Sequence, residues 1–428
     1  MPARVVEVKG SQIKIELTVD RSRSMLETEE AIQVALNEAG CLASREALRY
    51  FDTDGSPIQI GPEIWRTKGQ QPKCYQTPYG EVELERHVYQ RSGGGATYCP
   101  LEREARLVIT STPRFAKQVS SKLAQGAARD VRRDLAENHA RPVAVSYLQR
   151  LSEAIGTVVQ AKEADWKYAL PELEAAVASV AVGLDGTCML LCEEGWREAM
   201  VGTIALFNAE GERQHTLYVA ATPEYGKQTF LDRLERELER VKAAYPQATA
   251  IGLADGAESN WRFLTPRTTV RLIDFYHASG YLQTAAEAAF PKTQDQAQRQ
   301  TWLQDRCHRL KHEPDSAQAL LQEMQRLPTA GLTATQREQL QSAITYFYYH
   351  HPQMDYAGAL ENHWPIGSGV TEAACKTLVK QRLCRSGMRW KQKGAAVVLS
   401  LRALMLTPDR WRQFWDKLDQ FGFPVAVS

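Results

Sequence analysis

The sequence lacks an excess of either charge, a long apolar run and an N-terminal targeting pattern. Its 428 residues contain 52 Lys or Arg and 51 Asp or Glu, which leaves a formal net charge of +1. Affinity for a polyanion therefore has to come from local basic patches rather than from the field of the whole protein. No apolar run approaches the roughly 20 residues that span a bilayer, and no basic segment followed by an apolar one opens the chain. We expect a soluble protein that does not enter membranes.

Paired cysteine motifs are also absent. The chain has eight cysteines, and none of them forms a CxxC pair. The spacing therefore offers neither a redox motif nor the ligand cluster of a structural zinc site. We expect the cysteines to be buried as small apolar residues in a protein of the reducing cytoplasm.

The first hundred residues predict a small α+β unit, covering residues 1–105. Alternating apolar residues favour strands at 5–8 and 13–19 and a further strand near 80–89. An amphipathic pattern favours a helix at 28–37. We assign no chemistry to this unit.

A helix-turn-helix is predicted within residues 106–165. The apolar spacing favours helices at 115–137 and 145–155, separated by a break at 138–142. Eight Lys or Arg lie between positions 114 and 150 against three acids, a local excess of five positive charges. Such an excess suits contact with DNA phosphates. The residues of this region that we expect to contact DNA are Arg129, Arg132 and Arg133.

A sheet is predicted to follow. The near-continuous apolar run at 177–184 favours a buried central strand that ends at Asp185. A hairpin, an amphipathic helix and two further apolar strands come next, and those strands end at Asp255 and Asp274. The predicted order is strand, strand, strand, helix, strand, helix, strand. The domains expected here are a sheet core in two parts, 166–277 and 356–405, an all-helical insertion at 278–355 and a tail at 406–428.

Three acids stand in distinctive settings. They are Asp185 in Val-Gly-Leu-Asp-Gly-Thr, Asp255 in Gly-Leu-Ala-Asp-Gly-Ala-Glu and Glu372 in Pro-Ile-Gly-Ser-Gly-Val-Thr-Glu. An aspartate followed by glycine at a strand end is often only a turn signal, so either aspartate alone would be structural. In an open sheet, however, functional side chains collect beyond the carboxyl ends of the strands. Because carboxylates bind Mg²⁺, and two such ions promote displacement at phosphorus, we expect these three residues to be catalytic and to hold metal.

A basic run follows the third acid. The helix expected to start near Thr371 places Glu372 on one face with Cys375 and Val379. The chain then carries no acid until Asp409. Uncompensated positive charge beside a carboxylate cluster is expected where the backbone of DNA passes. The residues of this run that we expect to contact DNA are Lys376, Lys380, Arg382, Arg385, Arg389 and Lys391.

Other residues near these positions have structural alternatives. His277, in Asp-Phe-Tyr-His just after the last strand, is expected to act in catalysis at the scissile phosphate or a carboxylate. A histidine satisfied at a strand end is the alternative. Glu258 is expected to cap a helix. The aromatic run Tyr346–Tyr349, with His350 and His351, is expected to pack in the helical core rather than to stack on bases.

These motifs resemble those of the ISKra-type insertion-sequence transposases. The resemblance covers residues 100–405 and rests on Leu-Asp-Gly-Thr at 184–187, Ala-Asp-Gly-Ala-Glu at 254–258, Asp-Phe-Tyr-His at 274–277 and the segment 365–390. It implies a bacterial DDE transposase of the α/β class, with an RNase H-like catalytic core and a helical insertion. Its triad falls on Asp185, Asp255 and Glu372. Relatives often carry a cysteine-rich knuckle ahead of the helix-turn-helix, and here only Cys99 stands in that stretch.

The resemblance also implies a reaction and its partners. The reaction is Mg²⁺-dependent cleavage at the ends of a mobile element and joining of the freed 3′ ends to target DNA, with Mn²⁺ able to substitute. The partners are the terminal inverted repeats and target DNA, bound by a homodimer or higher assembly at the nucleoid in the bacterial cytoplasm. The alternatives are an RNase H-like nuclease that cuts without joining, and a domesticated DNA-binding protein that has lost transposition.

Overall fold

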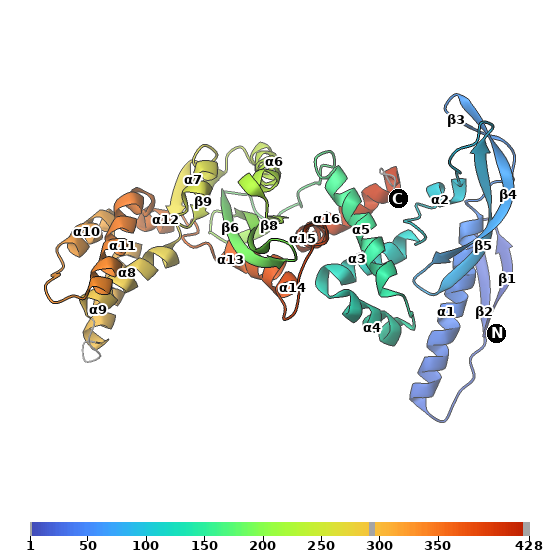
Figure 1. Ribbon diagram of the computed structural model, residues 1–428, viewed down its shortest axis with the longest axis horizontal. Helices are drawn as coiled ribbons and strands as arrows, with labels where there is room; N and C mark the ends of the chain where they lie inside the picture. Colours follow the sequence, from blue (N-terminus) through green and yellow to red (C-terminus); the bar gives the residue numbers. More distant parts are fainter. Residues whose placement is uncertain (1, 291–295, 423–428) are drawn as a thin grey trace. The chain divides into compact units, whose positions relative to one another are not determined.

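The computed structural model describes residues 2–290 and 296–422, and the chain divides into two compact units. The first unit comprises the residues up to Ala169, Ser400–Met405 and the described residues from Asp409 onward, and the second comprises Leu170–Leu399 and Leu406–Pro408. Figure 1 follows the chain through both. The α/β class is confirmed, because helices and a mixed sheet together build the protein.

The first unit begins with two small antiparallel sheets and one long helix. Its elements are β1 (Ala3–Lys9), β2 (Gln12–Leu17), α1 (Met25–Arg49), β3 (Ile58–Ile60), β4 (Glu63–Gln76), β5 (Glu81–Arg91) and α2 (Pro100–Glu104). Helix α1 starts where the Ser24 side chain accepts a hydrogen bond from the Glu27 backbone. The sequence did not predict β4, because this strand is exposed along most of its length and lacks an apolar alternation.

Three helices complete the N-terminal part of this unit. They are α3 (Pro113–Gln125), α4 (Ala128–His139) and α5 (Val145–Lys162). The single helix predicted at 115–137 is wrong, because the backbone at Gly126 is extended (φ −129°, ψ 165°) and ends α3 there. The three helices pack on one another, and each buries apolar residues such as Val119, Leu135 and Leu148.

The C-terminal segment predicted as a tail contains a helix of the first unit. Helix α15 (Gln392–Leu406) is followed by α16 (Arg410–Phe421), whose Phe414 and Trp415 are buried. The Gln413 side chain makes two hydrogen bonds with the Ala169 backbone, of 2.7 and 3.1 Å. The prediction missed α16, although its aromatic residues recur at helical spacing. Residues 423–428 lie outside the described part of the chain.

The second unit is built on a five-stranded mixed sheet. Its first elements are β6 (Ser179–Leu191), β7 (Gly195–Phe207), β8 (Arg213–Ala221), η1 (Tyr225–Lys227), α6 (Gln228–Ala244), β9 (Thr249–Ala254), α7 (Glu258–Leu264) and β10 (Val270–Ile273). The strands lie in the order β10-β9-β6-β7-β8, with β9 and β10 parallel to β6. The predicted order of strands and helices is confirmed. The predicted end of β6 at Asp185 is wrong, because β7 pairs with β6 as far as Leu191.

Helices cover both faces of this sheet. On one face, Val182 of β6 belongs to the same buried cluster as Leu234 of α6. On the other face, Ala181 packs with Val370 of α13 (Gly369–Ala374). Figure 1 shows α6 and α13 on opposite sides of the strands. Because side chains alternate along a strand, Asp185 lies on the same face as Ala181, toward α13.

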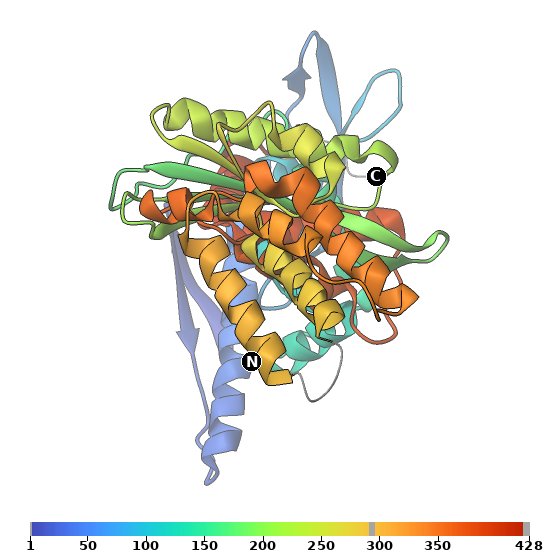
Figure 2. The same cartoon turned by 90° about the vertical axis from the view of Figure 1, so that its left-hand side faces the viewer.

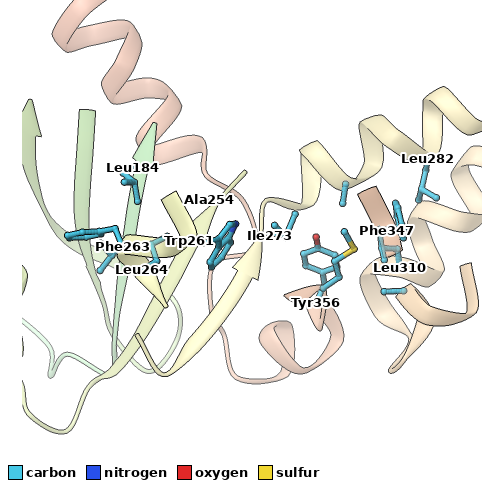
Figure 3. Close-up of a cluster of buried hydrophobic side chains, with 14 of the residues drawn as sticks. Leu184, Ala254, Trp261, Phe263, Leu264, Ile273, Leu282, Leu310, Phe347 and Tyr356 are labelled. Atoms are coloured by element: carbon cyan, nitrogen blue, oxygen red, sulfur yellow. The ribbon is translucent and has the colours of Figure 1, made fainter. Parts of the chain in front are cut away.

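Helices occupy the chain between β10 and α13. They are α8 (Phe275–Ala289), α9 (Gln296–His312), α10 (Ser316–Gln325), α11 (Ala334–His350), η3 (His351–Gln353) and α12 (Tyr356–Glu361). The expected helical character of this segment is confirmed for its described residues. Figure 2 shows α8 to α11 packed against one another. Figure 3 shows that one buried cluster runs from Leu184 and Ile273 of the sheet to Phe347 and Tyr356 of the helices.

Candidate active site

Two aspartates stand opposite each other where the pairing of β6 with β9 ends. The last parallel pair is Val182 with Gly252. Asp185 and Asp255 each follow three positions later, so an extension of this register places them side by side, and the Asp255 charge acts on Asp185. The two strands no longer pair at that point, which leaves both carboxylates at the open end of the parallel strands.

The Asp255 side chain is held by the turn that follows it. Its Oδ1 accepts hydrogen bonds from the Ala257 backbone (3.0 Å) and from Asn260 Nδ2 (3.1 Å). Asn260 Nδ2 also lies 3.4 Å from the Leu184 carbonyl oxygen, so this one amide bridges the turn to β6. The indole nitrogen of Trp261 donates to the Asp255 carbonyl (2.6 Å). The first turn of α7 therefore fixes Asp255 next to the strand that carries Asp185.

The Asp185 carboxylate is half-buried and lies close to other acidic groups. Gly186 N–H donates to its Oδ1 (2.7 Å), and the Cys375 thiol lies 3.6 Å from its Oδ2. Burial raises the pKa of Asp185, the Gly186 bond opposes that change, and the Asp255 charge raises it further. Burial and the Asp185 carboxylate likewise raise the pKa of the Cys375 thiol to about 12. Two like charges held together in this way favour a bound cation.

Glu372 approaches this centre from the helix on the same face. Thr371 anchors that helix, because its hydroxyl lies 2.7 Å from the Thr203 hydroxyl of β7 and fills the space over Gly183. A Cβ at Gly183 would lie 2.1 Å from the Thr371 oxygen, so only glycine fits there. The Glu372 side chain is exposed and accepts a hydrogen bond from Ser368 Oγ (3.1 Å).

The face predicted for Glu372 is wrong. Cys375 and Val379 are buried, whereas Glu372 lies on the exposed edge of the helix. The helix starts at Gly369 rather than near Thr371, and it continues as a π-helical turn, η4 (Cys375–Lys380), before α14 (Gln381–Leu383). A π turn adds a residue to the helical repeat and so shifts which side chains share a face.

An open pocket of about 750 Å³ lies between Asp185 and Glu372. Asp185 lines its wall from β6, and Glu372, Lys376 and Lys380 line it from α13 and η4. Two acids and two exposed lysines therefore line the same pocket. A ligand that carries an anionic backbone fits such a lining.

Asp274 has a positioning role in this arrangement. It is fully buried one residue beyond β10, and its Oδ1 accepts a hydrogen bond from His277 N–H (2.9 Å), which caps α8. Its Oδ2 accepts a second hydrogen bond from Ser368 N–H. The Phe275 N–H bonds to the Ile366 carbonyl (2.9 Å) nearby. Asp274 thus ties the loop that begins α13, and with it Glu372, to the edge of the sheet.

The two remaining polar candidates lie at the surface. His277 is exposed in the first turn of α8, and the contact that places it is its backbone bond to Asp274. Glu258 is exposed as well, at the first residue of α7, where it pairs with Arg262 (2.9 Å). The expected helix cap is not formed, because among the described residues no side chain caps α7 and Glu258 instead pairs with Arg262 along the helix surface.

The basic run after Glu372 is divided between surface and core. Arg382 was expected to contact DNA, but only 3% of it is exposed. Its guanidinium lies over the Trp390 ring, 5.0 Å from the ring centroid. The other members of the predicted set are exposed, namely Lys376, Lys380, Arg385, Arg389 and Lys391.

The first unit has a basic pocket of its own. The predicted DNA contacts Arg129, Arg132 and Arg133 are exposed on α4. A separate pocket of about 610 Å³ is lined by polar and aromatic groups of α1, α3 and α16, among them Asn37, Arg114, Lys117, Lys122 and Trp411. Burial and the neighbouring Arg114 charge lower the pKa of Lys117. Cations crowded in this way favour an anionic ligand.

The expectations for cysteines and aromatic residues hold only in part. All eight cysteines are unpaired, but only Cys375 is buried, and Cys74, Cys188 and Cys192 are exposed. In the aromatic run of α11, Phe347 is buried in the core, as expected, whereas Tyr348 and Tyr349 are exposed. No local pattern distinguishes these neighbours, because their burial is set by where α11 packs.

Neither known protein families nor curated proteins identify this site. No model of a known protein family matches the chain, and no curated protein matches it. Among the residues described, no three His, Cys, Asp or Glu side chains gather closely enough to hold a metal ion. In the same residues, no helix combines the length and apolar character needed to cross a bilayer.

Proposed function

We propose that the chain is a DDE transposase with an RNase H-like core, which cuts DNA at the ends of a mobile element and joins them to target DNA. The observation that carries this proposal is the pair of aspartates set opposite each other by the β6–β9 register, with Glu372 in the same pocket as Asp185. The resemblance of the surrounding motifs to ISKra-type transposases supports it. The exposed lysines in that pocket add the charge that a DNA strand requires.

The donor set suits Mg²⁺. Asp185 and Asp255 offer hard oxygen ligands side by side. Burial raises the pKa of Asp185, and the neighbouring Asp255 charge raises it further. Asp185 and Asp255 would hold the ion between them, and Glu372 would complete the set from the pocket rim. When bound, Mg²⁺ supplies Lewis-acid activation of the attacking oxygen and stabilisation of the leaving one. Mn²⁺, which also prefers carboxylate oxygen, is expected to substitute.

The protein groups have separate tasks in this reaction. Asn260 and the turn after Asp255 keep that carboxylate in place, and Asp274 keeps the start of α13 in place. Lys376 and Lys380 hold the DNA strand by its phosphates. Cleavage adds water across one P–O bond and leaves a 3′-hydroxyl. Joining uses that hydroxyl to attack a target phosphate and releases a 3′-hydroxyl of the target.

The remaining parts fit the same proposal. The exposed arginines of α4 and the basic pocket of the first unit would bind the terminal inverted repeats. Because two element ends react together, a homodimer or higher assembly on DNA is part of the proposal. The reaction takes place in the cytoplasm, at the nucleoid of a bacterium.

Cleavage and joining assays test the proposal. The substrate is a labelled duplex made from inverted repeats in the DNA that flanks the gene, with Mg²⁺ or with EDTA. We expect Mg²⁺-dependent nicking and strand transfer by the wild type and neither by Asp255→Asn or Glu372→Gln. Nicking without transfer would favour the nuclease, and binding without any cut would favour the domesticated DNA-binding protein.

The basic run gives a further prediction. Replacing both Lys376 and Lys380 by Ala is expected to weaken DNA binding and to reduce the slope of log affinity against log salt by about two, because each lysine neutralises one phosphate. The melting temperature should stay near that of the wild type, because both side chains are exposed. Arg382→Ala is the matched contrast, since it removes a buried cation from Trp390 and should cost about 1 kcal/mol of stability or more. An unchanged salt slope in the double variant would place the DNA elsewhere.

A further inference from the structure

Two side chains of α11 touch the turn that carries Asp255. A Cβ built on Gly256 would lie 2.7 Å from Tyr346 Cε2 and 2.8 Å from His350 Nε2. Both residues come from the helical segment, far along the chain from Gly256. They lie one turn apart on α11, so a single edge of this helix faces the residue next to the Asp255 carboxylate.

Tyr346, which contacts Gly256, is itself packed against a ring of another helix. Tyr346 stacks on Tyr281 of α8, with ring centroids 3.8 Å apart and an interplanar angle of 16°. The His350 ring lies 4.6 Å from the Tyr346 ring. The three rings therefore form one contiguous group that ends at Gly256, with the half-buried imidazole tilted by 55° against the Tyr346 ring.

One polar atom of these rings has no partner in the described part of the chain. The Tyr346 hydroxyl is buried and has no hydrogen-bond partner among the residues described. Burial raises the pKa of Tyr346, and the charges of Tyr281, Asp255 and Asp274 raise it further. A buried polar group without a partner is unfavourable, so it calls for an explanation, and a role in a functional site is one.

We propose that His350 is a further residue of the active site, which donates a hydrogen bond from its imidazole to the DNA phosphate bound beside Asp255, with Tyr346 as its support. This inference rests on the function proposed above. It assigns the helical segment a direct part in substrate contact. An imidazole N–H is a suitable donor to phosphate, and it sits where the glycine leaves space next to the carboxylate.

Kinetics test the role against a purely structural one. His350→Ala is expected to slow single-turnover cleavage at least tenfold, by analogy with the loss of one oxyanion-hole donor, which costs about 10²–10³ in rate. His350→Gln keeps an N–H donor and should recover much of that rate. Tyr349→Ala, an exposed neighbour on the same helix, is the control. A fall in melting temperature without rescue by Gln would instead show that His350 only packs.

A footprint tests the contact without any catalysis. Diethyl pyrocarbonate modifies accessible imidazoles, and mass spectrometry reports each histidine separately. In Ca²⁺, the duplex is expected to slow modification of His350 several-fold while leaving the exposed His308 and His312 unchanged. Equal modification of His350 with and without bound duplex would overturn the inference. If the protein binds DNA but never cuts it, the proposed function fails, and the footprint still decides the role of His350.

Discussion

Replacing Asp185 by Asn is expected to abolish cleavage and joining and, at the same time, to stabilise the metal-free protein. The catalytic loss follows because Asp185 is half of the carboxylate pair. Its removal should lower the rate by about 10³-fold or more, as expected when a group that supports transition-state charge is lost. The gain in stability follows because Asp185 is held partly out of water and beside Asp255. Asn keeps the oxygen that accepts from Gly186.

The stability gained by Asp185→Asn depends on pH, and the raised pKa of Asp185 sets the direction of that dependence. The pKa of Asp185 is raised in the folded protein above its ordinary value of 3.8. Ionisation therefore opposes folding above the folded pKa, and this cost disappears as the pH falls below 3.8. Asp185→Asn should be more stable than the wild type at neutral pH, and the difference should shrink toward zero in acid.

Thermal melts in EDTA measure this difference. Asp232→Asn is the matched control, because Asp232 is an exposed aspartate of α6 whose Oδ1 accepts one hydrogen bond from Gln228. It should change neither the melting temperature nor the activity. Adding Mg²⁺ should then stabilise the wild type more than Asp185→Asn, since the ion binds the folded protein only. A variant that melts below the wild type at neutral pH contradicts the proposed crowding of the two carboxylates.

The sequence predicted the sheet well because the signal there is local. The mostly apolar run before Asp255 marks a strand buried on both faces, and the shorter run before Asp274, which includes the exposed Arg271, marks a second strand; the structure has β9 and β10 there. The position of Asp185 was found for the same reason, although β6 continues past it. That continuation depends on β7 pairing along the whole of β6, which an apolar run cannot reveal.

The parts that escaped prediction depend on contacts between distant segments. Nothing local in the aromatic run separates Phe347, which enters the core, from Tyr346, which reaches Gly256. The buried state of Arg382 depends on Trp390, which stands later in the chain and folds back over it. The role of Asp274 was hidden in the same way, because its second partner is Ser368. Such pairings are fixed by tertiary packing, which local propensity does not encode.

Replacing Asp274 by Ala is expected to cost about 2–4 kcal/mol of folding free energy and to abolish activity. The side chain is fully buried and accepts from two backbone N–H groups, those of His277 and Ser368. Removal leaves both donors without this partner, at about 1–3 kcal/mol each, and it removes the cap of α8. The loop that begins α13 then loses its tie to the sheet, so Glu372 is no longer held near Asp185.

Asp274→Asn separates positioning from stability. An amide has one acceptor oxygen, so it keeps one of the two bonds and turns an N–H toward the other donor. We expect a moderate loss of stability and a much larger loss of cleavage rate, because the loop before Glu372 is displaced while the sheet remains intact. Asp355→Ala is the matched control, since Asp355 caps α12 through Gly358 N–H (3.0 Å) but is exposed. It should cost about 1 kcal/mol and leave the rate unchanged. Full cleavage by Asp274→Asn would show that Glu372 is positioned without this tie.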